Sequence, residues 1–528
     1  MQRTFFQMVW VLAFLGVIVS LLTAEPSAAT AAIGTQSSSL TLSADDPGRL
    51  KNVRSKITAV LDSTGVASIT VAVARDGKIV WEEGFGWANR EERVEATPHT
   101  MYHLASVSKS FTATGLMVLV ERRLIDLDRP ANEYIGEAKL TAFAGSADEA
   151  TVKRILFHTA GLPMYWNIFE VGGQYRPPDM GESIKRYGIL VTAPGERYCY
   201  SNFGYGILDH IITNVSGTDY ADFMKKEVFG PLGMTRTSVL VDSSMVEHVA
   251  RMYDGKHQPL GPCDFDHRGA SAVLSSAHDL VRYGMFHLKE RIPEQTPILR
   301  EETIDRLHRE TDPQLPELKE TIGFECLLGS FGALDIGGYR IDVCTGSMPG
   351  ASSRLALVPS ENLVTVVLCN EMSIDLWEIE KAILGAMLPG FSEACESEIG
   401  HRREESGIST VPPEYFVGSW TGDITTYTGA QPVKLRFSST GEIDMTINGR
   451  AAPLLTIKTP LGEMGFRGDL FKGLFMSSID TPDAARSPHV VLVEVLYRDG
   501  RLTGYAAAVA MNKRYCLPYW MELRHSEE

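Results

Sequence analysis

Ser106 and Lys109 stand three residues apart where a strand-like stretch, residues 101–104, meets an apolar helical pattern that continues to Val120. Residues three apart on a helix share one face, so the amine is expected about one turn from the hydroxyl. A buried lysine loses its proton more easily, and the neutral amine then deprotonates the serine. The unpaired amides at a helix start also favour a developing oxyanion. The pair therefore predicts a serine nucleophile, although Ser-x-x-Lys also occurs by chance in chains of this length.

A second stretch with chemical potential is Tyr200 and Asn202, which lie between Pro194-Gly195 and a helical pattern over residues 206–215. A Tyr-x-Asn spacing places a phenol and an amide on the same side of an extended loop. The phenol can exchange a proton with a neighbouring lysine, and the amide can hold that lysine or a substrate carbonyl. An aromatic loop packed on the core explains the same residues equally well.

A third stretch runs from Cys344 to Gly350, between strand patterns over residues 338–343 and 353–358. Gly346 allows a substrate to lie against the strand edge, and the amide of Ser347 could complete an oxyanion hole with that of Ser106. The alternative is an ordinary Gly/Pro turn.

In this order, the three stretches resemble the Ser-x-x-Lys, Tyr-x-Asn and Lys-Thr-Gly or His-x-Gly motifs of the serine β-lactamase and penicillin-binding-protein superfamily. The resemblance is to its class C β-lactamase-related branch, which includes esterases and D-amino-acid peptidases. Supporting stretches at 157–162, 229–234 and 269–280 also resemble that branch. The resemblance covers roughly residues 48–390.

This resemblance implies a role for each matched residue. Ser106 would be the acylated nucleophile and Lys109 its base, while Tyr200 would relay protons and Asn202 would orient Lys109 and the substrate. The backbone amides of Ser106 and Ser347 would form the oxyanion hole. Cys344, Thr345 and Gly346 would line the substrate site.

Cys344 departs from the family pattern, which has Lys or His at this position. A neutral thiol offers no charge to a substrate carboxylate and is only a weak donor. We therefore expect preference for esters or amides over carboxylate-bearing substrates, and a catalytically decayed binding protein is the alternative. Cys344 is not expected to be the nucleophile, because its segment contains no histidine base.

No metal or organic cofactor is expected. One loop contains His257, Cys263, Asp264, Asp266 and His267, but their spacing fits no standard zinc pattern, so a polar surface loop near the active-site mouth is predicted. The absence of Gly-x-Ser-x-Gly argues against an α/β-hydrolase.

The composition limits the partners. A net charge of −16 and the lack of a basic stretch argue against nucleic acid, which leaves a small molecule or peptide as the expected substrate. Seven scattered cysteines indicate core thiols with at most one bridge rather than a disulfide framework. The sequence does not define an oligomeric state.

The N-terminus predicts export to the periplasm or the extracellular space. Arg3 precedes an apolar run from Phe5 to Leu22, and small residues follow. We expect a cleaved signal peptide; an uncleaved segment that anchors the chain to a membrane is the alternative.

A length of 528 residues indicates more than one domain. We expect an α/β (α+β) catalytic domain with an antiparallel sheet flanked by helices, and then a small up-and-down all-β barrel. Alternating patterns over residues 67–73 and 79–84 predict a hairpin around Asp76-Gly77 early in the catalytic domain. The prediction of a barrel is based on evenly spaced strand patterns and on Gly418-Ser419-Trp420, which resembles the Gly-x-Trp of lipocalins. The expected divisions are a signal region at 1–32, a linker at 33–47, the catalytic domain at 48–390, a linker at 391–411 and the lipocalin-like barrel at 412–528.

Overall fold

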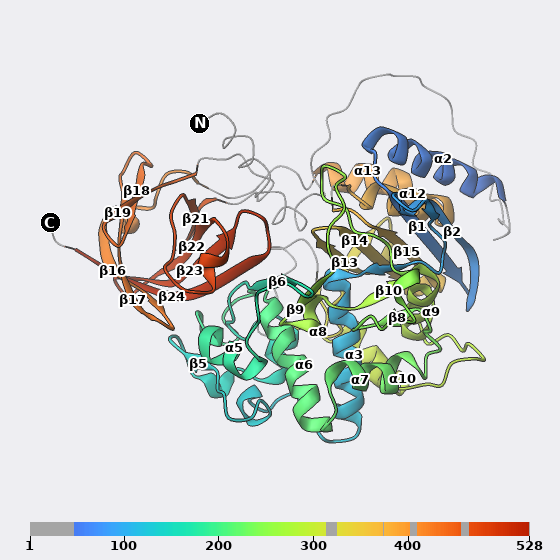
Figure 1. The fold of residues 1–528 in the computed structure, drawn as a ribbon, viewed down its shortest axis with the longest axis horizontal. Helices are drawn as coiled ribbons and strands as arrows, with labels where there is room; N and C mark the ends of the chain where they lie inside the picture. Colours follow the sequence, from blue (N-terminus) through green and yellow to red (C-terminus); the bar gives the residue numbers. More distant parts are fainter. Residues whose placement is uncertain (1–46, 313–324, 373, 402–408, 456–463, 527–528) are drawn as a thin grey trace.

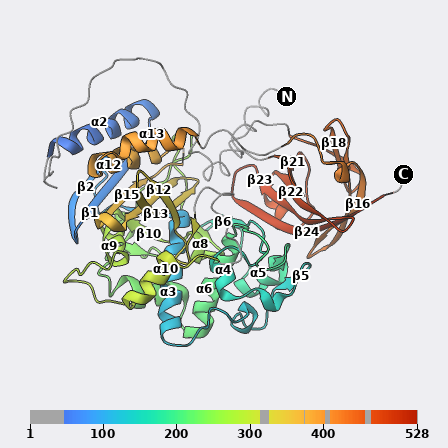
Figure 2. The same cartoon turned by 180° about the vertical axis from the view of Figure 1, so that it is seen from behind.

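The structure is a computed structural model that describes residues 47–312, 325–372, 374–401, 409–455 and 464–526. The predicted signal peptide and almost all of the linker that follows it lie outside these residues. Within the described part of the chain, no helix is both long enough and apolar enough to span a membrane. Figures 1 and 2 show a larger α/β part joined side by side to a smaller β part.

The α/β part is built on an antiparallel sheet in the order β11-β12-β13-β14-β15-β1-β2-β3. Its first two strands in the sequence form the predicted hairpin, and both turn residues, Asp76 and Gly77, have positive φ as a tight primed turn requires. The strands are β1 (Ser68–Arg75), β2 (Lys78–Asn89), β3 (Val94–Glu95), β11 (Glu325–Cys326), β12 (Gly332–Ile336), β13 (Tyr339–Met348), β14 (Ala351–Val358) and β15 (Leu363–Cys369).

Both faces of this sheet are covered, and β1 shows how. Its seven residues from Ser68 to Ala74 are all buried, and successive side chains point to opposite faces. Val71 and Val73 pack with the N-terminal helix and two helices near residue 390, whereas Ala72 and Ala74 join the larger core on the other face. The helices on the first face are α2 (Pro47–Thr64), α12 (Trp377–Met387) and α13 (Phe391–His401), which lie together in Figure 1.

The opposite face is covered by α9 (Ala277–His287), which contacts β1, β14 and β15. Beyond it lies a mainly helical region that contains α3 (Ser108–Glu121) and α6 (Asn202–Ser216), seen below the sheet in Figure 1. Nearly every residue of α3 is buried, so this helix is a rigid support for whatever its first turn carries.

The C-terminal part is a curled antiparallel half-barrel in the order β19-β18-β17-β16-β24-β23-β22-β21-β20. Strand β17 alternates exposed and buried residues from Gln431 to Phe437, the pattern of a sheet with one packed face. The strands are β16 (Gly418–Thr426), β17 (Gly429–Phe437), β18 (Ile443–Ile447), β19 (Arg450–Pro453), β20 (Gly465–Arg467), β21 (Leu470–Phe475), β22 (His489–Arg498), β23 (Arg501–Ala510) and β24 (Tyr515–His525).

The predicted β-barrel is present as a half-barrel, whose path of paired strands begins at β19 and ends at β20. The end of β19 and the residues just after it bridge to β21: the amide of Met476 donates to the carbonyl of Pro453, and the amide of Leu455 donates to the carbonyl of Leu474, each over 2.8 Å. The lipocalin likeness stays a prediction. The predicted linker at 391–411 needs correction at its start, because α13 occupies Phe391–His401 and buries Phe391 and Cys395 against the first helical layer.

The two parts share a sheet. Strand β6 (Trp166–Glu170) of the α/β part pairs with β24 and, on its other side, with β9 (Cys263–Phe265). Figure 1 shows β6 between the half-barrel and the helices. Because main-chain hydrogen bonds cross this boundary, the half-barrel is attached directly to the layer that holds α6.

Candidate active site

Ser106 lies in a 3-10 turn, Ala105–Val107, that follows β4 (Met101–His103) and leads directly into α3. This agrees with the predicted strand-to-helix position. Ala105 has φ +47°, a left-handed conformation that costs a non-glycine residue on the order of 1 kcal/mol. Ser106 is half-buried between fully buried neighbours, so its hydroxyl stays accessible on a fixed backbone.

Lys109 is 1% exposed and makes three short contacts. Its Nζ lies 3.1 Å from Ser106 Oγ, 2.7 Å from Asn202 Oδ1 and 3.0 Å from the carbonyl oxygen of Ala270. None of these three acceptors is charged. Burial therefore holds the pKa of Lys109 well below its usual value of 10.5.

Tyr200 completes a chain of hydroxyl and amine groups, because its Oη lies 2.7 Å from Ser106 Oγ. Burial raises the pKa of the Tyr200 phenol above its usual value of 10.0, and the hydrogen bond with Ser106 offsets only part of that rise. At neutral pH the phenol keeps its proton. The opposite shifts favour a neutral amine on Lys109 and a protonated phenol on Tyr200.

Asn202 is the first residue of α6, and its amide orientation follows from its contacts. Its Nδ2 donates to the carbonyl of Tyr165 over 2.8 Å, which turns Oδ1 toward Lys109. The preceding Ser201 caps the helix by accepting from the amide of Gly204. The Tyr-x-Asn stretch is thus a helix entry, not only a packed aromatic loop.

Strand β13 lies against the turn that carries Ser106, as the third motif predicts. A Cβ on Gly346 would overlap the carbonyl oxygen of Leu104 and lie 3.0 Å from the amide nitrogen of Ser106. Glycine is required by this close approach. The next residue, Ser347, brings its backbone to the same edge, where it pairs with Ser352 of β14.

The other two predicted substrate-site residues differ in exposure. Thr345 is exposed at the edge, whereas Cys344 is buried and its thiol donates to the carbonyl of Ser330 over 3.0 Å. Burial raises the pKa of the Cys344 thiol, so this position carries no charge. The six cysteines whose side chains the structure describes are all free thiols.

The loop from His257 to His267 was predicted to be a polar surface loop, which is wrong at its end. Asp266 and His267 are buried and paired, with His267 Nδ1 2.8 Å from Asp266 Oδ1. Asp264 binds Arg268, and His257 binds Glu371. Asp264 and His257 thus have partners outside the loop, whereas Asp266 and His267 pair with each other.

The sequence did not assign His158, Ser353 or the carbonyl of Ala270. His158 Nδ1 accepts from the amide of Ser201, and its carbonyl accepts from Cys199, so it shapes the loop that carries Tyr200. Ser353 Oγ donates to the carbonyl of Leu104 over 2.6 Å. His158 lies in the supporting stretch at 157–162, whereas a backbone carbonyl leaves no sequence signal.

The sheet between helical layers, with a Ser-Lys-Tyr cluster at the edge of β13, defines a β-lactamase type of domain. The family model described as Beta-lactamase matches residues 53–379, more than half of the chain, and the chain belongs to this serine β-lactamase and penicillin-binding-protein family.

Two curated relatives show its range. The "Serine beta-lactamase-like protein LACTB, mitochondrial" of Homo sapiens is 25% identical over 305 residues, 44% of this chain and 56% of that protein. "Penicillin-binding protein 4*" of Bacillus subtilis is 31% identical over 196 residues, 35% of this chain and 41% of that protein. The chain spans about half the length of these curated relatives.

Solved structures support the fold. An octameric penicillin-binding protein homologue from Pyrococcus abyssi aligns with a TM-score of 0.56 and 23% identity over 89% of this chain and 99% of its own. A class C β-lactamase aligns with a TM-score of 0.55 and 19% identity over 64% of this chain and 96% of its own.

Proposed function

We propose that this protein is an exported serine hydrolase that acts through an acyl-enzyme on Ser106. Its substrates are esters, amides or short peptides that contain D-amino acids, with weak binding of β-lactams or penicillin, and it needs no metal or organic cofactor. The family membership supports the hydrolase class, and the predicted signal region supports export. The observation that carries the proposal is the set of hydrogen bonds around Lys109.

A neutral lysine amine has two N–H groups and one lone pair. Asn202 Oδ1 and the carbonyl of Ala270 are acceptors only, so they take both N–H groups. The lone pair is left for the third neighbour, the hydroxyl of Ser106. Since burial favours the neutral amine, the resting cluster is arranged for Lys109 to remove the proton of Ser106.

The steps follow from these positions. Ser106 Oγ attacks the substrate carbonyl carbon and its proton passes to Lys109, while the amides of Ser106 and Ser347 hold the oxyanion. Collapse breaks the bond to the leaving group, which takes a proton from Tyr200. Lys109, whose Nζ lies 4.9 Å from the centre of the Tyr200 ring, returns a proton to the phenol. A water molecule then attacks the acyl carbon and gives one proton to Lys109; the bond from that carbon to Ser106 Oγ breaks, and Oγ takes the proton back from Lys109.

Intact-mass labelling tests the proposal. Purified protein is incubated with a fluorophosphonate and, separately, with a penicillin, beside Ser106→Ala. The expected result is a Ser106-dependent fluorophosphonate adduct and slow or incomplete penicillin labelling. Rapid labelling by both reagents would move the substrate class toward β-lactams. A folded protein that reacts with neither would overturn the hydrolase proposal.

That last outcome would favour the alternative, a catalytically decayed binding protein. The observation behind it is Cys344, a buried neutral thiol where the family motif has Lys or His. Cys344→Lys tests the consequence for specificity. We expect turnover of carboxylate-bearing substrates to rise relative to neutral ones; an unchanged ratio would contradict a role of this position in carboxylate recognition.

A further inference from the structure

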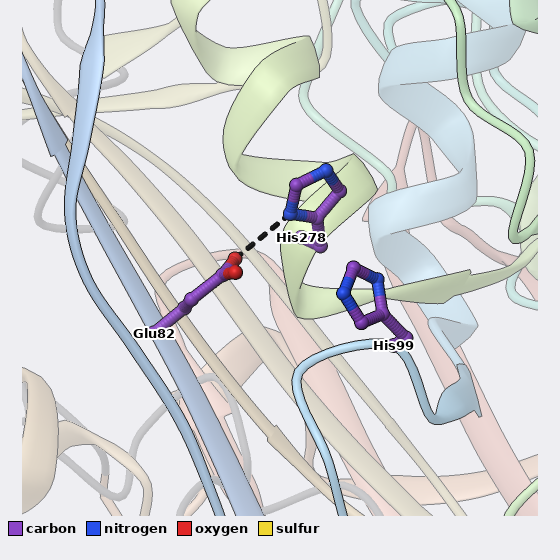
Figure 3. A group of neighbouring side chains, drawn as sticks. All are labelled: Glu82, His99 and His278. Carbon is purple, nitrogen blue, oxygen red and sulfur yellow. Dashed lines mark hydrogen bonds and ion pairs between the residues drawn. The ribbon is translucent and has the colours of Figure 1, made fainter.

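Glu82, His99 and His278 converge from three separate elements (Figure 3). Glu82 lies on β2, His99 in the turn before β4 and His278 at the start of α9. One ligand atom from each residue lies within 4.8 Å of the other two. Among the described residues, this is the group that brings three potential ligands together.

The backbone around these residues holds the three elements in place. The amide of His278 donates to the carbonyl of Pro98 over 3.1 Å, which joins α9 to the turn that carries His99. Inside that turn, the amide of Thr97 donates to Thr100 Oγ1 over 2.9 Å. Gly84 of β2 lies so close to the carbonyl of Ala96 that a Cβ would overlap it. Backbone contacts therefore hold the three elements in place without a bound ion.

The donor atoms suit a particular class of ion. Two imidazoles and one carboxylate form a set that Zn²⁺ prefers, whereas Mg²⁺ and Ca²⁺ prefer oxygen ligands. Zinc bonds of about 2.1 Å in a tetrahedron place neighbouring donors about 3.4 Å apart, so small side-chain rotations are sufficient here. His278 Nδ1 and Glu82 Oε2, 2.8 Å apart, now share a proton that the ion would replace.

The exposure of the group leaves room for water. The side chains of Glu82 and His278 are 28% and 27% exposed, and His99 is exposed. Three protein ligands with an accessible fourth position describe an open zinc site. The site stands outside the Ser106 cluster and takes no part in the proposed acylation.

The geometry points to Glu82, His99 and His278 as a Zn²⁺ site that fastens β2 and α9 to the turn leading into β4. Because β4 runs directly into the turn of Ser106, bound zinc stabilises the support of the nucleophile without contacting it. The site is additional to the hydrolase activity and does not depend on it.

The test is a Zn²⁺ titration of the untagged full chain after chelator treatment, followed by calorimetry and by thermal unfolding. We expect one saturable Zn²⁺ per chain, a higher unfolding midpoint with zinc, and no competition from Mg²⁺. His99→Ala and Glu82→Gln are each expected to weaken binding at least about tenfold, since even outer-shell changes cost that much.

The matched control is His248→Ala. The His248 side chain is 28% exposed, close to the value for His278, but it lies outside the group. It should bind zinc like the wild type. Because Glu82→Gln keeps the hydrogen bond to His278, its unfolding midpoint without zinc should be unchanged, which separates ligand loss from misfolding. Equal zinc affinity in wild type, His99→Ala and Glu82→Gln, or no saturable binding, would overturn the site.

Discussion

Two basic side chains in this molecule, the buried Lys109 and the partly exposed Arg186, have opposite surroundings. Lys109, in the candidate active site, contacts only neutral acceptors, and burial lowers its pKa. Arg186, at the junction with the half-barrel, is also partly desolvated, but its hydrogen bonds with Glu182 and Asp483 raise its pKa. A buried amine without a counter-charge is shifted toward its neutral form, whereas two carboxylates keep Arg186 charged in an ion pair.

Hydrogen bonds also connect the junction with the half-barrel to the candidate active site. Arg486 donates to Asn167 Oδ1 over 2.8 Å, and Asn167 Nδ2 donates to the buried Asp266 over 2.7 Å. The carbonyl of the neighbouring Tyr165 accepts from Asn202 Nδ2 over 2.8 Å. The half-barrel thus supports the elements that orient Lys109, although none of its described residues belongs to the Ser106 cluster.

Lys109→Met gives the largest expected effect. Without the base, labelling of Ser106 by a fluorophosphonate should slow by about 10²–10⁴-fold, while the unfolding midpoint stays level or rises because a buried amine is replaced by an apolar group. Labelling reactions that are quenched at successive times and analysed by intact-mass spectrometry give the rate constant. Lys185→Met, on an exposed position of α5 (Met180–Tyr187), is the control and should react like wild type.

The pH dependence of the same rate sharpens this prediction. Because burial lowers the pKa of Lys109, the amine stays neutral well below pH 10.5 and the rate is lost only when pH falls through the lowered pKa. The raised pKa of Tyr200 keeps the phenol protonated across neutral pH. An acid limb at an ordinary lysine pKa would contradict Lys109 as the base.

Asp483→Asn is expected to lower the stability of the fold rather than the rate of Ser106 labelling, the reverse of Lys109→Met. Asp483 binds Arg186, Tyr187 and Tyr427 at distances of 2.7–2.9 Å. Loss of its charge should cost about 2–3 kcal/mol of unfolding free energy, less than a fully buried pair because Arg186 is about a quarter exposed. Urea unfolding measures it. Asp444→Asn, in an exposed pair with Arg436, should change stability by less than about 0.5 kcal/mol.

Gly346→Ala tests whether the strand edge and the nucleophile turn must touch. The added methyl would overlap the carbonyl of Leu104 and approach Ser353 Oγ, so the strand has to shift, at a cost of about 1–3 kcal/mol. Labelling of Ser106 should slow more than about tenfold. Gly181→Ala is a suitable control, since its Cβ would meet only Asp179 Oδ1 at 3.3 Å. Normal labelling of folded Gly346→Ala would refute the requirement.

The sequence predicted what depends on local pattern. The hairpin at Asp76-Gly77, the strand-to-helix position of Ser106 and the strand that carries Gly346 all follow from turn residues and apolar periodicity. It missed what depends on distant contacts. Helix α13 exists because Phe391 and Cys395 pack on a remote layer, and the strand order of the half-barrel depends on pairings between strands far apart in the chain.

Glu494→Gln has the smallest expected effect. Glu494 itself links the half-barrel to the loop that carries Tyr200. Glu494 Oε1 lies 3.2 Å from Arg197, three residues before Tyr200, and Oε2 lies 3.6 Å from Lys472. Burial alone would raise the pKa of Glu494, but these cations and Tyr505 lower it. The variant should lose about 1–2 kcal/mol at pH 7 and label Ser106 less than about tenfold more slowly.

The sign of its pH dependence provides the check. A carboxyl whose pKa is lowered on folding adds stability above its ordinary value of 4.5, and that stability is lost as pH falls through the folded pKa. The difference between wild type and Glu494→Gln in urea unfolding should therefore shrink as pH is lowered below 4.5. A difference that stays constant in acid would mean that the charge of Glu494 does not stabilise the junction.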